Sequence, residues 1–307
     1  MSSDLDAVAT LSGRLAAAED LDALLDVALA SMEQLWGFEH AMMLVVEEDS
    51  DRLVTLASRG YDRGGVGSEV VVGAGIIGVV AERRTPVRIG NVSYAMRYAR
   101  ATRDEAARDG GTEGAREIPL PGLAKVDSQL AVPMLAQGRL IGVICVESPA
   151  QAAFDGRAEQ CLSIAANQIG AGIALSAPER DRASPAAAAT PVPTPGPQGQ
   201  PIKVRYYRED CSVFLDGDYL IKSLPGRILW RLLVQLRDEG RSEFTNKELR
   251  LDAALGLPPV KDNLETRLIL LRRRLEERCG AIRMVKAGRG RFRLEVARAF
   301  EIEEIGA

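Results

Sequence analysis

Residues 128–149 read SQLAVPMLAQGRLIGVICVESP, and this stretch predicts a β-hairpin. Two apolar runs, 130–135 and 140–146, flank a short turn that contains Gly138. Apolar runs on both sides of a tight glycine turn are typical of paired antiparallel strands. The first half of the chain is therefore expected to contain an antiparallel sheet.

The segments on both sides of this hairpin supply helices and further strands. Apolar residues recur at helical spacing in residues 11–35, which predicts one or two amphipathic helices, and again in a helix expected over 155–175. Strands are expected at 41–46, 53–58 and 69–72, and a short helix at 76–82. This order predicts an α+β sandwich built on an antiparallel sheet.

Three segments resemble the GAF domain family. They are VGAGIIGVVAERRTPVRIGNV at 72–92, the hairpin stretch at 128–149, and AFDGRAEQCLSIAANQIGAGIA at 153–174. The resemblance covers roughly residues 10–175. It implies a central sheet of about six strands, a small-molecule cavity on one face, and a homodimer formed through the first and last helices. The identity of the small molecule, and of any cofactor, stays open.

A Pro/Ala-rich segment divides the chain. Residues 177–201 read APERDRASPAAAATPVPTPGPQGQP and show no apolar periodicity, so we expect an extended linker there. We therefore predict a GAF sensor domain at 1–176, the linker at 177–201, and a second domain at 202–307.

The second domain is expected to contain strands, three helices and a terminal hairpin. Residues 204–215 predict one strand, and 219–223 predict its partner after the turn at Asp216-Gly217-Asp218. A helix should begin near Pro225, and Thr245 with Glu248 forms a capping-box pattern at the start of the next. Leu264, Leu268, Leu271 and Leu275 mark a third helix, and strands at 282–285 and 291–296 flank a basic turn.

This segment resembles the winged-helix DNA-binding domain of OmpR-type response regulators. The matching pieces are FTNKEL at 244–249, LRRRLE at 271–276 and IRMVKAGRGRFRL at 282–294, within a match over about 203–297. The resemblance implies that the third helix enters the major groove and that the hairpin contacts the backbone or the minor groove of double-stranded DNA. On the outward face of that helix we expect Lys261, Asn263, Thr266, Arg267, Arg273, Arg274 and Arg278, and on the hairpin Arg289, Arg291 and Arg293.

The third helix also departs from this family. Ile269 and Leu270 stand where polar or basic residues often face the groove. An alternative hypothesis is therefore a signalling adaptor whose winged helix binds a protein partner. The phosphorylated receiver domain that usually accompanies such domains is replaced by the GAF-type segment.

Charge is distributed unevenly along the chain. Residues 1–200 carry 17 Lys and Arg against 26 Asp and Glu, whereas residues 201–307 carry 22 against 17. The front is therefore acidic (net −9) and the rear basic (net +5). This asymmetry is typical of a sensor joined to a module that binds a polyanion.

A glycine-rich motif, Gly73-x-Gly75-x-x-Gly78, fits the dinucleotide-binding pattern GxGxxG. That site also needs a parallel βαβ unit and an acidic residue about 20 positions later. Residues 94–101 contain no acidic residue, so we interpret the motif as a turn that lets a strand and a helix pack closely.

His40, the single histidine, is a candidate haem or metal ligand. The chain offers it no obvious partner, and a position at the start of a strand favours ordinary exposure. We therefore expect no metal site.

An arginine-bearing segment follows the glycine motif. Arg97, Arg100 and Arg103 fall at intervals of three and could share one face of a short helix. Facing inward, they would bind a phosphate or carboxylate of the ligand. The favoured alternative is a solvated lid in which they pair with nearby acidic residues.

The chain lacks the features of an enzyme, a membrane protein or a secreted protein. The four cysteines, Cys145, Cys161, Cys211 and Cys279, are widely spaced and show no metal-binding, disulfide or reactive-cysteine pattern. No run approaches the roughly 20 apolar residues of a membrane span, and the acidic N-terminus has no signal core. We therefore expect a cytoplasmic, non-enzymatic one-component transcriptional regulator, with the adaptor as the alternative.

Overall fold

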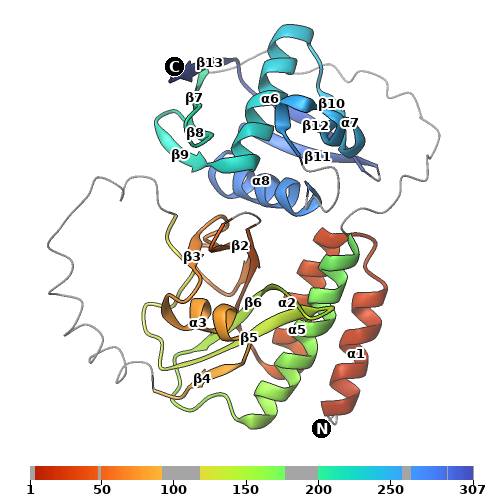
Figure 1. The fold of residues 1–307 in the computed structure, drawn as a ribbon, viewed down its shortest axis with the longest axis vertical. Coiled ribbons are helices and arrows are strands. Elements are labelled where there is room, and N and C mark those ends of the chain that lie inside the picture. The colour runs from red at the N-terminus through yellow and green to blue at the C-terminus, as the bar shows by residue number, and fades with distance from the viewer. Residues whose placement is uncertain are drawn as a thin grey trace, which may run out of the picture. The chain divides into compact units, whose positions relative to one another are not determined.

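The computed structural model describes residues 4–47, 50–91, 118–176, 200–257, 264–288 and 290–306. The chain divides into two compact units, Met1–Ser176 and Ala177–Ala307, called here the N-terminal unit and the C-terminal unit and described separately (Figure 1). Most of the expected linker, 177–199, lies outside the described residues. None of the described helices has the length and apolarity needed to cross a membrane.

A six-stranded sheet forms the centre of the N-terminal unit, in the order β3-β2-β1-β6-β5-β4. Its strands are β1 (His40–Val46), β2 (Arg52–Arg59), β3 (Glu69–Val71), β4 (Val87–Ile89), β5 (Ser128–Ala136) and β6 (Arg139–Ser148). All neighbours pair antiparallel. The predicted hairpin is β5–β6, and the predicted α+β architecture with an antiparallel sheet is confirmed. The short strand β4 was not expected.

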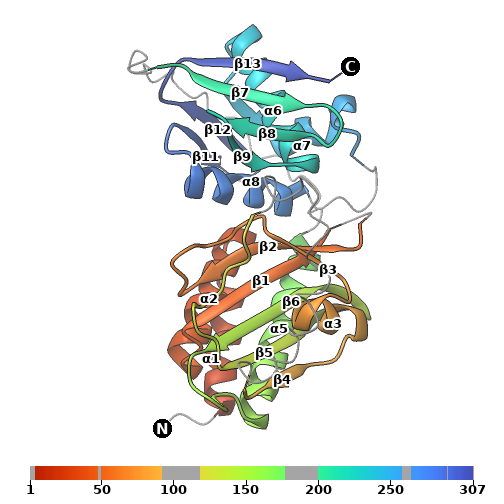
Figure 2. The ribbon, with the colours of Figure 1, turned by 90° about the vertical axis from the view of Figure 1, so that its left-hand side faces the viewer.

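Three helices cover one face of this sheet: α1 (Asp4–Ala16), α2 (Leu21–Trp36) and α5 (Gly156–Ser176). α5 packs on β5 and β6, α2 packs on β1 and β2, and α1 lies against both helices (Figure 2). The first apolar stripe forms two helices because Asp20 caps the second: its carboxylate accepts a hydrogen bond from the Ala23 N–H at 2.9 Å.

The glycine motif forms the turn from β3 into α3 (Gly75–Arg83), which packs on the opposite face of the sheet. Gly73 adopts a φ of +86°, and its N–H donates to the carbonyl of Gly78 at 2.8 Å. A Cβ on Gly78 would lie 2.3 Å from the carbonyl oxygen of Val71. The glycines thus permit close strand–helix packing beside an antiparallel sheet, without the parallel βαβ unit of a dinucleotide site.

The C-terminal unit contains two sheets and three α-helices among its described residues. One sheet has the order β13-β7-β8-β9 and the other β10-β12-β11. Its elements are β7 (Ile202–Tyr207), β8 (Ser212–Leu215), β9 (Asp218–Ile221), α6 (Ser223–Glu239), β10 (Glu243–Thr245), α7 (Asn246–Leu251), the 3-10 helix η2 (Ala253–Leu255), α8 (Leu264–Arg278), β11 (Ile282–Gly288), β12 (Arg291–Val296) and β13 (Phe300–Ile305).

Local sequence signals define the helices of this unit. Pro225 lies in the first turn of α6, and Gly240 ends the helix in the left-handed conformation. The capping box expected at Thr245 is present: its hydroxyl accepts from the Glu248 N–H at 3.2 Å, and the Glu248 carboxylate accepts from the Thr245 N–H at 3.0 Å. This reciprocal pair begins α7.

Two features of the first sheet differ from the prediction. The single strand expected over 204–215 is split into β7 and β8, because the Asp210 carboxylate accepts hydrogen bonds from the N–H and hydroxyl of Ser212 and closes a turn. The second difference is β13, which pairs in parallel with β7 and was not expected (Figure 2).

Candidate functional site

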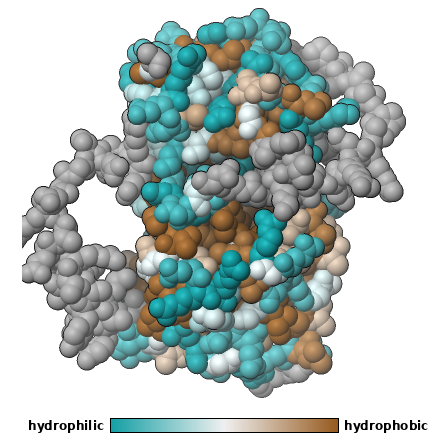
Figure 3. All heavy atoms as spheres, viewed as in Figure 1, coloured by the Kyte–Doolittle hydropathy of each residue, from teal (hydrophilic) through white to brown (hydrophobic). Residues whose placement is uncertain are grey.

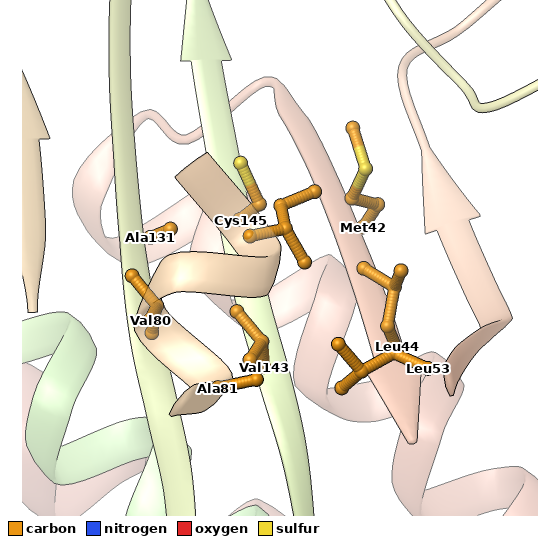
Figure 4. Close-up of a cluster of buried hydrophobic side chains, with 9 residues drawn as sticks. Met42, Leu44, Leu53, Val80, Ala81, Ala131, Val143 and Cys145 are labelled. Carbon is orange, nitrogen blue, oxygen red and sulfur yellow. The ribbon is translucent and has the colours of Figure 1, made fainter. Parts of the chain in front are cut away.

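A buried apolar cluster lies between α3 and the sheet of the N-terminal unit. Figure 4 shows side chains of β1 and β6 on the side of the sheet that α3 covers. The cluster consists of Met42, Leu44, Leu53, Ile77, Val80, Ala81, Ala131, Val143 and Cys145. Residues from four strands and one helix thus form a packed apolar core between α3 and the sheet.

A row of three polar residues, His40, Gln129 and Glu147, crosses the sheet next to this cluster. Glu147 on β6 is the register partner of His40 on β1 and of Gln129 on β5. Cys145, in the cluster, lies two residues before Glu147 on the same strand. Alternate residues of a strand point to the same face, so the polar row lies on the face that carries the apolar cluster.

Glu147 is the most deeply buried member of the polar row, with 7% of its surface exposed. The Gln129 amide donates a hydrogen bond to Oε1 of Glu147 at 3.1 Å and a second to the Cys145 thiol at 3.2 Å. The backbone N–H of Leu123 donates to Oε2 at 3.3 Å. Both donors are neutral, and no Lys or Arg pairs with this carboxyl within the part of the chain that the structure describes.

Tyr61 places its phenol beside this carboxyl. It follows Gly60, whose φ of +83° and close approach to the backbone of Glu39 leave no space for a side chain. The Tyr61 hydroxyl is buried and lies within hydrogen-bonding reach of the Glu147 carboxyl. The phenol is therefore a third neutral donor to this buried carboxyl.

Burial dominates the protonation behaviour of this cluster. It raises the pKa of the Glu147 carboxyl, an effect that the Leu123 N–H, Tyr61 and His40 partly offset. Burial, together with the nearby Glu147, also raises the pKa of the Tyr61 phenol and of the Cys145 thiol. The thiol therefore stays protonated and unreactive at neutral pH.

His40 belongs to this row by position but is held by the backbone. Its Nδ1 lies 2.6 Å from the carbonyl oxygen of Gly60, so Nδ1 carries the proton and donates it. Among the described residues, no group of three His, Cys, Asp or Glu side chains is arranged to hold a metal ion. The predicted ligand-binding arginines, Arg97, Arg100 and Arg103, lie outside the described residues.

Tyr61, Gln129 and Glu147 were not predicted from the sequence. They come from three separate segments, which only the strand order brings together. One signal was available: Glu147 directly follows the apolar run of β6, and a carboxylate buried at the end of such a strand requires partners.

The predicted DNA-binding residues of α8 occupy different surfaces of that helix. Arg273 is partly exposed and Arg278 is exposed, as expected. Thr266 and Arg267 are each only 7% exposed, and the neighbouring Ile269 and Leu270 are buried as well. Lys261 and Asn263 lie outside the described residues.

Arg274 differs from its predicted outward orientation. It is buried, and its Nε donates to the carbonyl oxygen of Leu220 on β9 at 2.9 Å, while Nη1 pairs with Glu277 at 3.1 Å. The physical reason is helical spacing: Arg267, Arg274 and Arg278 are seven and four residues apart, so they share one flank of α8. At Arg274 this flank contacts β9. The guanidinium therefore binds groups of its own unit and does not point outward.

The β11–β12 hairpin of the C-terminal unit carries exposed positive charge. Arg283 and Arg291 are exposed and have no carboxylate partner within the described residues. Arg293 is partly exposed and pairs with Glu295 at 2.6 Å, and Arg289 is not among the described residues.

On the face drawn in Figure 3, hydrophilic residues are spread over both units with hydrophobic groups among them.

Comparison with known proteins identifies the first of the two units. The GAF domain family matches residues 18–174, whereas no curated protein matches the chain. Similar solved structures include the GAF domains of phosphoenolpyruvate-protein phosphotransferases from Acinetobacter (22% identity, TM-score 0.47, covering 57% of this chain and 95% of that one) and Coxiella burnetii (18%, 0.44, 56% and 93%). Another is free methionine-R-sulfoxide reductase from Neisseria meningitidis in complex with its substrate (19%, 0.44, 57% and 94%).

Proposed function

The chain belongs to the GAF domain family, and we propose that it is a one-component transcriptional regulator. In this proposal a small molecule binds the N-terminal unit on the α3 face of the sheet. The C-terminal unit is a winged-helix domain that binds double-stranded DNA, and the linker connects ligand binding to DNA binding.

The apolar cluster and the adjoining polar row support a sensor that binds its ligand without transforming it. Small-molecule sites typically combine a mostly apolar lining with a few placed polar groups, and both are present on this face. The cysteines of this unit, Cys145 and Cys161, are buried, and burial raises the pKa of both thiols. Neither is poised as a nucleophile.

The observation that carries the DNA-binding proposal is the pair of unpartnered, exposed arginines, Arg283 and Arg291, on the β11–β12 hairpin. Cations without carboxylate partners are available to phosphates, which take most protein–DNA hydrogen bonds. The three helices followed by a hairpin, and the excess of 22 Lys and Arg over 17 Asp and Glu in residues 201–307, favour the same function.

Exposed apolar side chains on α1 and α5 support a homodimer through the helical layer. Leu5, Ile164 and Leu175 are exposed on these two helices, and a second copy would bury them. Two linked DNA-binding units then gain affinity through avidity. Sedimentation velocity of the full chain measures this state directly.

Salt-dependent DNA binding tests the proposal. Fluorescence anisotropy with labelled duplex fragments should show affinity that falls steeply with salt. Arg291→Ala should weaken binding and reduce the slope of log K against log salt by about 1, the value for one lost phosphate contact.

Arg139→Ala, an exposed arginine of the N-terminal unit, is the control and should leave DNA binding unchanged. Failure of the full chain to retain duplex DNA at low ionic strength would overturn the DNA-binding function.

A further inference from the structure

We propose that the C-terminal unit binds the phosphate backbone of duplex DNA without reading its base sequence, through Lys247, Arg283 and Arg291. These three cations are called here the phosphate-contact surface. This inference rests on the proposed DNA-binding function and specifies what the unit recognises on the duplex. It is drawn from the arrangement of the three cations and from the side chains that α8 offers to a DNA groove.

Two of these cations lie on the outward face of the β11–β12 hairpin. Exposed residues of β12 include Arg291 and Glu295, which are four positions apart and therefore share a face. Arg283 on β11 is the register partner of Glu295, so it stands on the same face. The Glu295 carboxylate pairs with Arg293 at 2.6 Å. Arg283 and Arg291 thus remain available to phosphates on one surface.

The third cation, Lys247, lies where the start of α7 meets the hairpin turn. Thr245, the last residue of β10, is the register partner of Arg291. The N–H of the next residue, Asn246, donates to the carbonyl of Gly290 at 2.9 Å. Lys247 follows directly, is exposed, and has no carboxylate partner within the described residues. Two elements distant in sequence therefore bring cations to the same end of the hairpin.

Helix α8, which the winged-helix resemblance places in the major groove, offers little for base readout. Reading a base sequence relies mainly on side chains that form hydrogen bonds with the base edges. Ile269 and Leu270, in the middle of α8, are apolar and buried. Arg274 is also buried and donates to the Leu220 carbonyl. These residues of α8 therefore contribute to packing rather than to sequence recognition.

Carboxylates near the end of α8 disfavour a phosphate contact there. Three arginines in the second half of this helix already pair with acidic side chains: Arg272 with Glu276 (3.9 Å), Arg274 with Glu277 (3.1 Å) and Arg278 with Asp218 (4.0 Å). A phosphate approaching this end would compete with those carboxylates, whereas at the phosphate-contact surface it meets cations that have none. Duplex DNA is therefore expected to cross the hairpin and the start of α7.

Comparison of duplexes with unrelated sequences tests this inference. Phosphate contacts carry no sequence information directly, so selection from a randomised duplex library by the full chain, followed by sequencing, should enrich no motif. Dissociation constants of individual duplexes, measured by fluorescence anisotropy at low salt, should agree within about threefold, whereas a protein that reads bases prefers its site by about a thousandfold or more.

Lys247→Ala and Arg283→Ala should each reduce the slope of log K against log salt by about 1 on every duplex, because each removes one phosphate contact. Lys203→Ala, at an exposed lysine on β7 of the same unit, is the matched control and should leave the slope unchanged. An enriched motif, or an unchanged slope for either variant, overturns the inference and leaves DNA binding standing. Failure to retain any duplex at low ionic strength counts against both.

Discussion

The sheets of the two units differ in how their strands are buried. In β1 the five consecutive residues 41–45 are buried, and β5 is buried over seven. In β7 and β12, buried and exposed residues alternate. Helices cover both faces of the N-terminal sheet, whereas β7 and β12 of the C-terminal unit each have one covered face and one more exposed face.

This difference determines where each unit can place functional groups. In the N-terminal unit a polar group on a central strand must be buried and must find partners inside, as Glu147 does. On β12 of the C-terminal unit every second residue faces outward, so arginines can be placed on the hairpin at little cost. The first arrangement suits a small enclosed ligand and the second a large charged partner.

The largest expected effect comes from a substitution in β6, a strand whose two faces are both covered. A Cβ on Gly142 would lie 2.0 Å from the carbonyl oxygen of Leu44 on β1. Because both strands are fixed on both sides, Gly142→Val should destabilise the N-terminal unit by more than about 4 kcal/mol, the exceptional end of single substitutions. Urea unfolding measures it, with Trp36 reporting on this unit and Trp230 on the other.

Gly13→Ala is the control for this substitution, because nothing lies within 4 Å of the added Cβ in helix α1. It should leave the unit as stable or slightly more stable. An unchanged unfolding midpoint for Gly142→Val would show that β1 and β6 can separate, contrary to the close packing described.

Substitutions at adjacent strand positions test the same difference in burial, with the next largest expected effects. Met42 and Met43 point to opposite faces of β1 and are both fully buried, so each substitution by alanine should cost about 2–5 kcal/mol. On β11, Met284→Ala should cost a similar amount, whereas Val285→Ala, at a position 36% exposed, should stay within about 0.5 kcal/mol. Equal costs at Met284 and Val285 would contradict the one-faced burial of β11.

The smallest expected effect concerns the buried charge of the C-terminal unit. Arg274→Ala removes the donor to the Leu220 carbonyl and should destabilise this unit by about 1–3 kcal/mol, the cost of leaving a buried acceptor unpaired. Arg278→Ala, on the same flank but exposed, should have little effect on the Trp230 transition. If Arg274→Ala instead weakened DNA binding and left stability intact, the predicted outward role of Arg274 would be restored.

Local signals predicted much of the fold. The turn of the β5–β6 hairpin, the Thr245 capping box and the helical leucine repeats each act within a few residues, so the sequence shows them directly. The short strand β4 and the parallel partner strand β13 were missed because each depends on a strand distant in sequence. The break between β7 and β8 was missed because the Asp210 turn lies inside an alternating pattern.

The candidate site was harder to predict for the same reason. His40 and Cys145 were considered singly, as a metal ligand and as a reactive thiol. Only the register of β1, β6 and β5 shows that His40, Glu147 and Gln129 form one row. Likewise, periodicity gives the flank of Arg274 on α8 but not the strand that this flank contacts.

The parallel pairing of β7 with β13 has a mechanical consequence. Ile202 begins β7 where the linker enters the unit, and its register partner Phe300 begins β13, so Ile305 ends β13 at the opposite end of the pair. Tension applied between the linker and Ile305 would load the inter-strand bonds in shear, all together, rather than peel them one at a time. Single-molecule pulling along this direction should therefore meet far greater resistance than pulling the two strands apart from Ile202 and Phe300.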